Sequence, residues 1–145
     1  MKYLFKILSV FILTLFVFSC DKDDDPVVTN PNVTYKVALN GMNETTPNSS
    51  TASGAGVLIF NSSTKIFTLT VTHTLASPAA GHIHKGAAGT SGPVEFSLGN
   101  LVSPITYTSV ALNATQEADL NAGLYYVNLH SAAFPSGEIR GQIVK

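Results

Sequence analysis

The sequence has a single cysteine, Cys20, among its 145 residues. One cysteine excludes an internal disulfide, so the folded part must be held together by its hydrophobic core. The chain also lacks a Gly-x-Ser-x-Gly nucleophile turn, a pair of carboxylates placed for glycoside hydrolysis and a phosphate-binding glycine loop between a strand and a helix. The common hydrolase and nucleotide-binding chemistries therefore find no support here.

Charge is also scarce, and its two signs nearly cancel. Only 12% of the residues are charged, and eight Lys and Arg against nine Asp and Glu give a formal net charge of −1. No basic stripe is present, which argues against a nucleic-acid partner.

The N-terminal segment has the pattern of a targeting signal. Lys2 and Lys6 precede the apolar run ILSVFILTLFVF at residues 7–18, which is too short for a spanning helix and fits the core of a signal peptide. Ser19 followed by Cys20 resembles the cleavage site of bacterial lipoproteins. That resemblance implies cleavage before Cys20 and lipidation of this cysteine, whereas an ordinary signal peptide with an incidental cysteine is the alternative.

An acidic and then Pro/Asn/Thr-rich stretch, DKDDDPVVTNPNVT, follows the cysteine. It has no hydrophobic periodicity, so we expect a solvated tether. Its Lys-Asp run resembles a surface-export signal of bacterial lipoproteins, although a generic acidic spacer explains it equally well. We expect a lipid anchor in the cell envelope, in the outer membrane, facing either the periplasm or the cell surface. The predicted segments are a signal peptide at 1–19, the lipidated cysteine and tether at 20–34, and one β domain at 35–145.

Short strand patterns dominate the predicted domain. In KIFTLTVTH at 65–73, apolar residues alternate with threonines, which indicates a half-buried strand. Further strands are predicted at 35–40, 54–61, 81–86, 93–99, 104–112, 124–130 and 137–145. One short helix is predicted at 113–123, with Thr115 as its N-cap. The pattern predicts an all-β fold, an antiparallel β-sandwich or barrel of immunoglobulin-like or superoxide-dismutase-like type, with one short helix.

Histidines are the residues of this domain that offer the clearest site chemistry. His82 and His84 are two apart on a predicted strand, so both imidazoles point the same way and Ile83 faces the core. His130 alternates with the apolar residues of its own strand, so its side chain also points away from the core. Because neutral imidazole suits copper and zinc, we predict a metal site at His82, His84 and His130 if the two strands are neighbours.

Two other interpretations stay open. In the first, the histidines donate hydrogen bonds to loop carbonyls and form, with Glu138 and Arg140, a structural polar cluster. In the second, the domain is a dismutase-like metalloenzyme, which needs a nearby acid, base or guanidinium, for which Arg140 is the one candidate. His73 shares the apolar face of its strand, and we expect it to be a satisfied core or strand-end residue.

Two separated motifs, GHIHKGAAGTSGPV at 81–94 and GLYYVNLHSAAFPSGEIRGQIV at 123–144, resemble the CHRD domain, the module named after chordin. The resemblance covers about residues 35–145 and implies a β-rich extracellular module. In chordin this module accompanies the binding of secreted growth factors, which bacteria lack, so that role does not transfer. We expect a membrane-anchored, non-enzymatic binding module for an unidentified envelope or surface ligand, with copper or zinc as the candidate ions; a purely structural or adhesive surface module is the alternative.

Overall fold

The structure, a computed structural model, describes residues 30–145. The predicted signal peptide, Cys20 and most of the predicted tether lie outside these residues. All strand pairs are antiparallel, and the eight strands form one sheet in the order β5-β4-β7-β8-β1-β2-β3-β6. The strands are β1 (Asn32–Asn40), β2 (Ser53–Asn61), β3 (Ile66–His73), β4 (Ala80–Lys85), β5 (Val94–Ser97), β6 (Ile105–Thr108), β7 (Tyr125–His130) and β8 (Ile139–Val144). The predicted all-β fold is confirmed.

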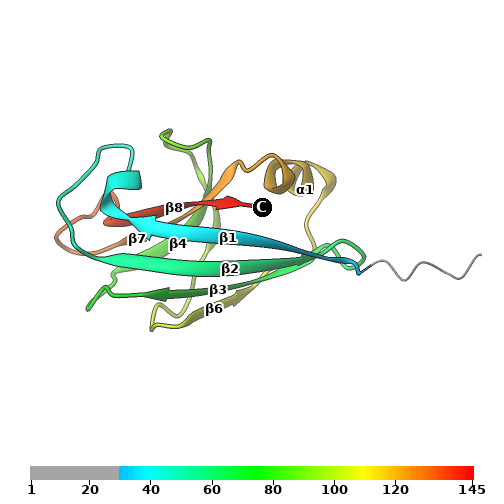
Figure 1. The fold of residues 1–145 in the computed structure, drawn as a ribbon, viewed down its shortest axis with the longest axis horizontal. Coiled ribbons are helices and arrows are strands. Elements are labelled where there is room, and N and C mark those ends of the chain that lie inside the picture. The colour runs from blue at the N-terminus through cyan, green and yellow to red at the C-terminus, as the bar shows by residue number, and fades with distance from the viewer. Residues whose placement is uncertain (1–29) are drawn as a thin grey trace, which may run out of the picture.

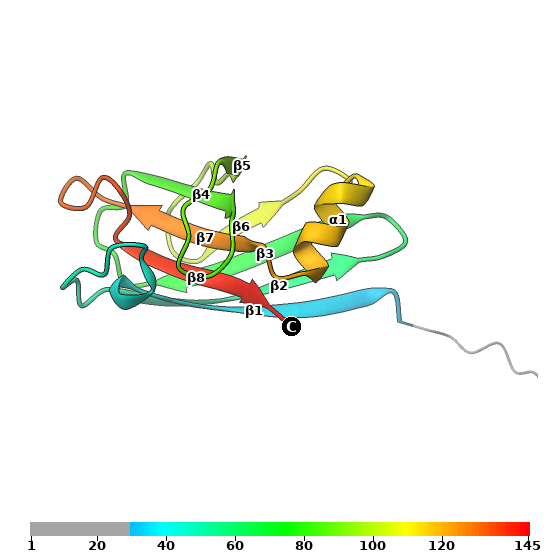
Figure 2. The same cartoon turned by 90° about the horizontal axis from the view of Figure 1, so that it is seen from above.

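The sheet curls around a single core until its two edge strands approach each other (Figures 1 and 2). Phe96 of edge strand β5 packs on Tyr107 of edge strand β6, with ring centroids 6.2 Å apart, and on Phe67 of β3 at 5.4 Å. Since β5 and β6 are the two ends of the strand order, aromatic packing closes the structure where hydrogen bonds do not. A sandwich or barrel of this kind is what the alternating strands predicted.

One short helix, α1 (Ala114–Asn121), was also predicted, but its N-cap is Asn113 and not Thr115. The Asn113 side chain accepts from the backbone N–H of Gln116, and the Gln116 side chain accepts from the backbone N–H of Asn113, which makes a capping box. An asparagine two residues earlier satisfies the free N–H groups of the first turn, so Thr115 lies inside the helix. The helix ends as predicted, because Gly123 follows it with a φ of 68°.

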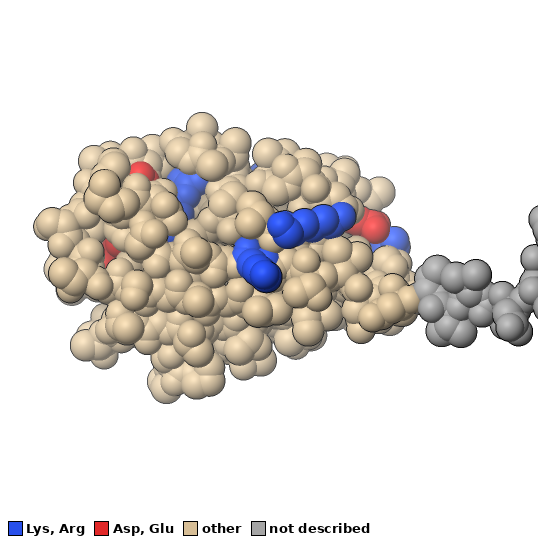
Figure 3. Space-filling view, viewed as in Figure 1, with Lys and Arg blue, Asp and Glu red and all other residues tan. Residues whose placement is uncertain are grey.

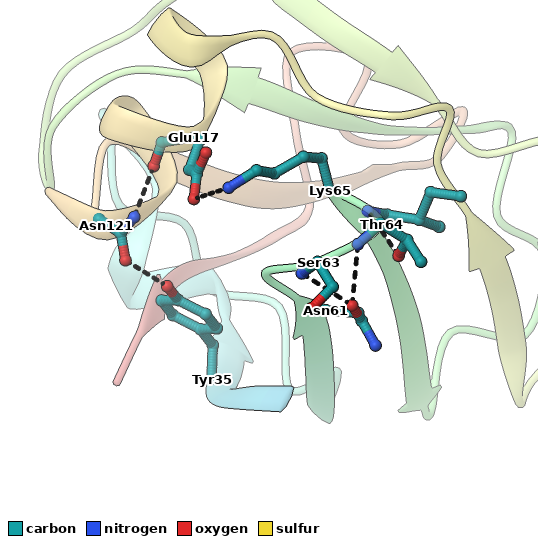
Figure 4. Close-up of polar contacts among 8 residues, drawn as sticks. Tyr35, Asn61, Ser63, Thr64, Lys65, Glu117 and Asn121 are labelled. Atoms are coloured by element: carbon teal, nitrogen blue, oxygen red, sulfur yellow. Dashed lines mark hydrogen bonds and ion pairs between the residues drawn. The ribbon is translucent and has the colours of Figure 1, made fainter. Parts of the chain in front are cut away.

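The helix is held against the sheet by two polar contacts near the start of β1 (Figure 4). Lys65, in the turn between β2 and β3, forms an ion pair with Glu117 at 2.9 Å. The Tyr35 hydroxyl of β1 donates to the Asn121 side chain at 2.9 Å. Strand β1 itself begins at Asn32, inside the segment that the sequence assigned to the tether. No helix within residues 30–145 has the length and apolar character needed to span a membrane.

Outward side chains of the sheet fall into two sets with opposite surroundings. On β1, β2, β3 and β6 they are exposed and almost uncharged, and Figure 3 shows how few charges this side of the molecule carries. We call this set the open face: Thr34, Lys36, Ala38, Ala55, Val57, Ile59, Thr68, Thr70, Thr72, Thr106 and Thr108. On β4, β7 and β8, apart from Ala80 and Val144 at strand ends, they are polar and buried or half-buried. We call this set the covered face: His82, His84, Tyr126, Asn128, His130, Arg140 and Gln142.

Three loops lie over the covered face and bury its side chains. The first contains the 3₁₀ turn η1 (Gly41–Asn43) and runs from β1 to β2, the second spans residues 86–93, and the third spans residues 131–138. Each contributes groups that contact covered-face side chains. The result is a strand, β7, in which five consecutive residues from Tyr125 to Leu129 are buried, although only alternate ones point into the core.

Candidate metal centre

Strand register brings the predicted histidines together. In the antiparallel pairing of β4 with β7, His82 lies opposite Asn128 and His84 opposite Tyr126. His130 is two residues beyond Asn128 on the same side of β7, so it occupies the position diagonal to His82. The predicted outward direction of all three imidazoles, and the burial of Ile83 in the core at 1% exposure, are confirmed.

The three rings converge on one point. Each offers a nitrogen such that the three nitrogens all lie within 4.8 Å of one another. His82 Nδ1 and His130 Nε2 are 3.3 Å apart, and the ring centroids are 5.2 to 6.2 Å apart. A tetrahedral ion with metal–nitrogen bonds of about 2.0–2.1 Å needs ligand nitrogens about 3.3 Å apart. The closest pair already has this spacing.

The remaining ring nitrogens are held by backbone carbonyls. His84 Nδ1 donates to the Gly92 carbonyl at 2.9 Å, and His130 Nδ1 donates to the Pro135 carbonyl at 3.0 Å. A carbonyl has no proton to give, so each Nδ1 must carry the hydrogen and each Nε2 of the neutral ring must carry a lone pair. His84 Nε2 is buried and has no hydrogen-bond partner among the described residues. Both rings are therefore oriented as metal-bound histidines are, with Nδ1 fixed by a carbonyl and the lone pair of Nε2 directed into the cluster.

Protonation also favours ligation. Burial, followed by the neighbouring His130 and His84, lowers the pKa of His82 below its ordinary value. Burial likewise lowers the pKa of His84, with further contributions from His130 and Arg140, against the opposing effect of the Gly92 hydrogen bond. Rings with lowered pKa values are neutral at pH 7 and keep the lone pairs that an ion requires.

The loop at 86–93 reaches His84 because Gly92 packs directly on β4. A Cβ atom at Gly92 would collide with the Lys85 carbonyl oxygen, so no other residue fits without moving the loop. The same glycine donates its backbone N–H to the Tyr126 hydroxyl at 3.1 Å. Close approach of this glycine is therefore what places its carbonyl on the His84 ring.

Tyr126 lies between His84 and Arg140, because its strand β7 runs between β4 and β8. Its ring stacks on His84 with centroids 5.0 Å apart and planes 6° apart, and the Arg140 guanidinium carbon lies 3.4 Å from the ring centroid. Arg140 is 2% exposed and donates to Thr45 Oγ1 and to the Ala87 carbonyl, each at 3.0 Å. One cation thus braces two covering loops and one face of the tyrosine that supports His84.

Glu138 and Arg140, predicted as a structural polar cluster, both contact the loop between β1 and β2. Glu138 Oε1 accepts from the Ser50 hydroxyl at 2.7 Å. Within residues 30–145 the ion pairs are Lys65–Glu117 and Lys85–Asp119, so Glu138 and Arg140 do not pair with each other. Their contacts therefore brace the covering loops.

A pocket of about 270 Å³ opens beside the histidines. Its lining consists of Glu44, Thr45, Thr46, His84, Ser91, Gly92, Tyr126, Asn128, His130, Ser136 and Gly137. Glu44 is 8% exposed and Asn128 is 5% exposed, and the two are joined by a 3.5 Å hydrogen bond from Asn128 Nδ2 to Glu44 Oε2. Burial raises the pKa of Glu44 to about 7, although Arg140 and the Asn128 hydrogen bond act in the opposite direction.

Glu44 was missed by the sequence analysis. It lies in a loop, GMNETTPN, where no periodicity predicts which side chains turn inward. One signal was present, since Glu44 is the sole acid between Asp25 and Glu95. In so sparsely charged a chain, a lone acid after a strand is a candidate for a site.

His73 lies outside the cluster, as its apolar strand position predicted. Its Nε2 donates to the Leu101 carbonyl at 2.9 Å, and its Nδ1 accepts from the backbone N–H of Leu75 at 3.2 Å. Both ring nitrogens are thus satisfied at the end of β3. This ring has no free lone pair for an ion and serves as the matched control for the other three.

The fold and the site together define an antiparallel β domain with a half-buried three-histidine cluster beneath loops on the outer side of its sheet. The profile of the CHRD domain matches residues 35–143, and the chain belongs to the CHRD domain family. Comparisons with curated proteins and with solved structures found no match.

Proposed function

We propose that this domain is a metal-binding module that holds copper or zinc through His82, His84 and His130. The observation that carries the proposal is the convergence of three imidazole nitrogens within 4.8 Å, two of them in rings whose second nitrogen is tied to a carbonyl. Three neutral nitrogen ligands without a carboxylate suit Zn²⁺ and Cu²⁺ better than Mg²⁺ or Ca²⁺, which prefer oxygen.

The ion would take the place of the hydrogen bond between His82 and His130. In its absence, His82 Nδ1 donates its hydrogen to the lone pair of His130 Nε2 across 3.3 Å. A change of the His82 tautomer frees Nδ1, and the ion then occupies the position between the rings. Little rearrangement is needed, since two of the three rings are already held by Gly92 and Pro135.

Location at the cell envelope belongs to the same proposal. The apolar run at 7–18 and Cys20 support a lipid anchor, which would hold the chain on a membrane for an unidentified envelope or surface ligand. Strand β1 starts at the end of the domain that carries α1, whereas η1 and the 131–138 loop lie at the other end (Figure 1). An anchored domain would thus present these loops away from the membrane.

The test is isothermal titration of Cu²⁺ and Zn²⁺ into the chain without residues 1–20, a truncation that removes no described strand and no core residue. We expect one ion per chain, and a loss of affinity of at least about 100-fold in His82→Ala, His84→Ala and His130→Ala. His73→Ala should bind as the wild type does. Absence of binding at micromolar metal, or equal affinity in the triple variant, would refute the metal site.

A structural function is the second candidate, because the same two histidine–carbonyl hydrogen bonds tie the covering loops to the sheet. If that is their whole role, His84→Ala lowers the thermal midpoint equally with metal and with chelator. If the ion binds, chelator lowers the midpoint of the wild type and leaves that of His84→Ala unchanged.

A further inference from the structure

The pocket beside the histidines contains buried hydrogen-bond acceptors that nothing satisfies. Glu44 Oε1 and Asn128 Oδ1 have no hydrogen-bond partner among the described residues, and both side chains are more than nine-tenths buried. A buried acceptor without a donor is costly, so two in contact need an explanation. Both line the same pocket as His84, whose Nε2 is the third unpartnered acceptor there.

These unsatisfied acceptors indicate the chemistry of a ligand that would bind in the pocket. An anion would place further acceptors beside the two that already lack donors, which makes it a poor fit. The lining also includes Thr45, Thr46, Ser91 and Ser136, whose hydroxyl groups are uncharged and can accept as well as donate. The ligand that fits is small and brings O–H or N–H donors, and water is the smallest of that class.

Gly137 keeps this space open. A Cβ atom at Gly137 would lie 2.7 Å from Glu44 Oε1 and 2.8 Å from Asn128 Oδ1. The glycine has a φ of 136°, a conformation that side chains disfavour. The chain therefore passes the two acceptors at a residue that adds no side chain to the space around them.

Three histidines leave an ion with an open position. Three protein ligands plus a water are the arrangement of reactive zinc sites, whereas structural sites close the fourth position with protein. Because His84 and His130 line the pocket, the open position of an ion bound to them faces it. The two acceptors then stand on the side from which a water molecule would bind.

We propose that the pocket holds a water molecule on the ion bound by His82, His84 and His130, and that Glu44 accepts a proton from this water. In the step, an O–H bond of the water breaks, the proton forms a bond to the Glu44 carboxylate, and hydroxide remains on the ion. Asn128 Oδ1 accepts the second hydrogen bond. The domain is then a water-activating metal centre. This inference rests on the proposed metal site, and it gives that site an exchangeable ligand and a proton acceptor.

Energetics agree with the geometry. A proton acceptor works best when its pKa is close to the ambient pH. Burial raises the pKa of Glu44 to about 7, which is in that range. Arg140, a nearby positive charge, lowers the pKa of Glu44 against the larger effect of burial.

The experiment is a pH titration of the visible absorption band of bound Cu²⁺, since Cu²⁺ binds nitrogen sites most tightly among the candidate ions. The chain without residues 1–20 is loaded with one equivalent and titrated from about pH 5.5 to about pH 9.5, around the range in which metal-bound water loses its proton. In the wild type we expect two steps, because the carboxyl and the bound water titrate as a coupled pair and copper senses both. Glu44→Gln should lose one of the two steps and keep the other.

Glu138→Gln is the matched control, because its carboxylate accepts from Ser50 and does not line the pocket. It should keep both steps. A Glu44→Gln titration that coincides with the wild type would overturn the inference and leave the metal site intact. No copper band in the wild type would overturn the metal site and the inference with it. If Glu44→Gln fails to fold, Glu44→Asp retains a carboxylate withdrawn by one methylene, and midpoints identical to the wild type would then refute the role of Glu44.

Discussion

The covered face and the open face belong to the same curled sheet and have the same alternating backbone, yet they differ in everything that bears on function. Outward positions of β1, β2, β3 and β6 carry threonine, valine, isoleucine and alanine, with Lys36 as the one charged residue of the open face, and they are exposed. Outward positions of β4, β7 and β8 carry histidine, tyrosine, asparagine and arginine, and Tyr126, Asn128 and Arg140 are 5% exposed or less. Polar side chains are thus buried where apolar ones are exposed.

The difference teaches that the loops, and not the strands, create the site. A strand of period two supplies one inward and one outward row wherever it runs. On the open face nothing covers the outward row, so small uncharged side chains suffice. On the covered face the loops exclude water, and polar groups must then find partners, which raises the cost of each unsatisfied atom. A functional cluster requires that cost to be offset by a ligand or by the loops themselves.

The largest effect should come from Arg140→Ala. This substitution removes a fully buried cation, its contacts with two loops and its stacking on Tyr126, and it leaves the Ala87 carbonyl and the Thr45 hydroxyl without this donor. We expect a loss of about 4 kcal/mol in the free energy of unfolding, measured by urea denaturation. Lys36→Ala, on the open face, should change it by less than about 0.5 kcal/mol. Similar losses in the two variants would contradict the contrast between the faces.

The next effect concerns Glu44 and depends on pH. Its pKa is raised to about 7 in the folded chain from an ordinary 4.5, so the folded state binds the proton more tightly than the unfolded state does. The stability that this proton supplies is complete below about pH 4.5 and is lost as the pH rises through about 7. The lowered pKa values of His82 and His84 act oppositely below their ordinary value of 6.5, so the wild type alone does not isolate the carboxyl.

Glu44→Gln isolates it, because glutamine resembles the protonated acid at every pH. In metal-free protein with chelator, the variant and the wild type should unfold at similar urea concentrations near pH 4.5. At pH 8 the variant should be more stable, by on the order of 3 kcal/mol. Parallel stability curves for the two proteins across this range would show that the carboxyl is not held in an unfavourable site.

Most of the fold was predictable because alternation reports directly on strands. The strand from Ile66 to His73 was visible in its threonines, and the convergence of His82, His84 and His130 followed from parity once β4 and β7 were neighbours. Neighbouring strands could only be assumed from the sequence. Pairing of segments more than forty residues apart depends on the whole topology, which local patterns do not contain.

The rest lies in loops, where no periodicity exists. Glu44, the carbonyls of Gly92 and Pro135, and the approach of the three loops over β7 are consequences of chain path. The predicted N-cap of the helix was wrong for a related reason. Asn113 and Thr115 are both good N-cap residues, and the path of the preceding loop decides between them. Glycines such as Gly92 and Gly137 mark the close approaches, but their contacts are known only from the fold.

The smallest effect should come from the open face, where Thr70→Val exchanges a hydroxyl for a methyl between Val57 and Thr106 of the neighbouring strands. We expect a change within about 0.5 kcal/mol in the free energy of unfolding, because the side chain is exposed and its cross-strand neighbours tolerate either group. Copper affinity, measured by titration calorimetry, should not change, since no contact links Thr70 to the covered face. A loss above about 1 kcal/mol that grows with protein concentration would show instead that the open face is covered by another copy in solution. In that case both faces would be buried. They would then differ in what covers them, because loops of the same chain cover one face and a second copy covers the other.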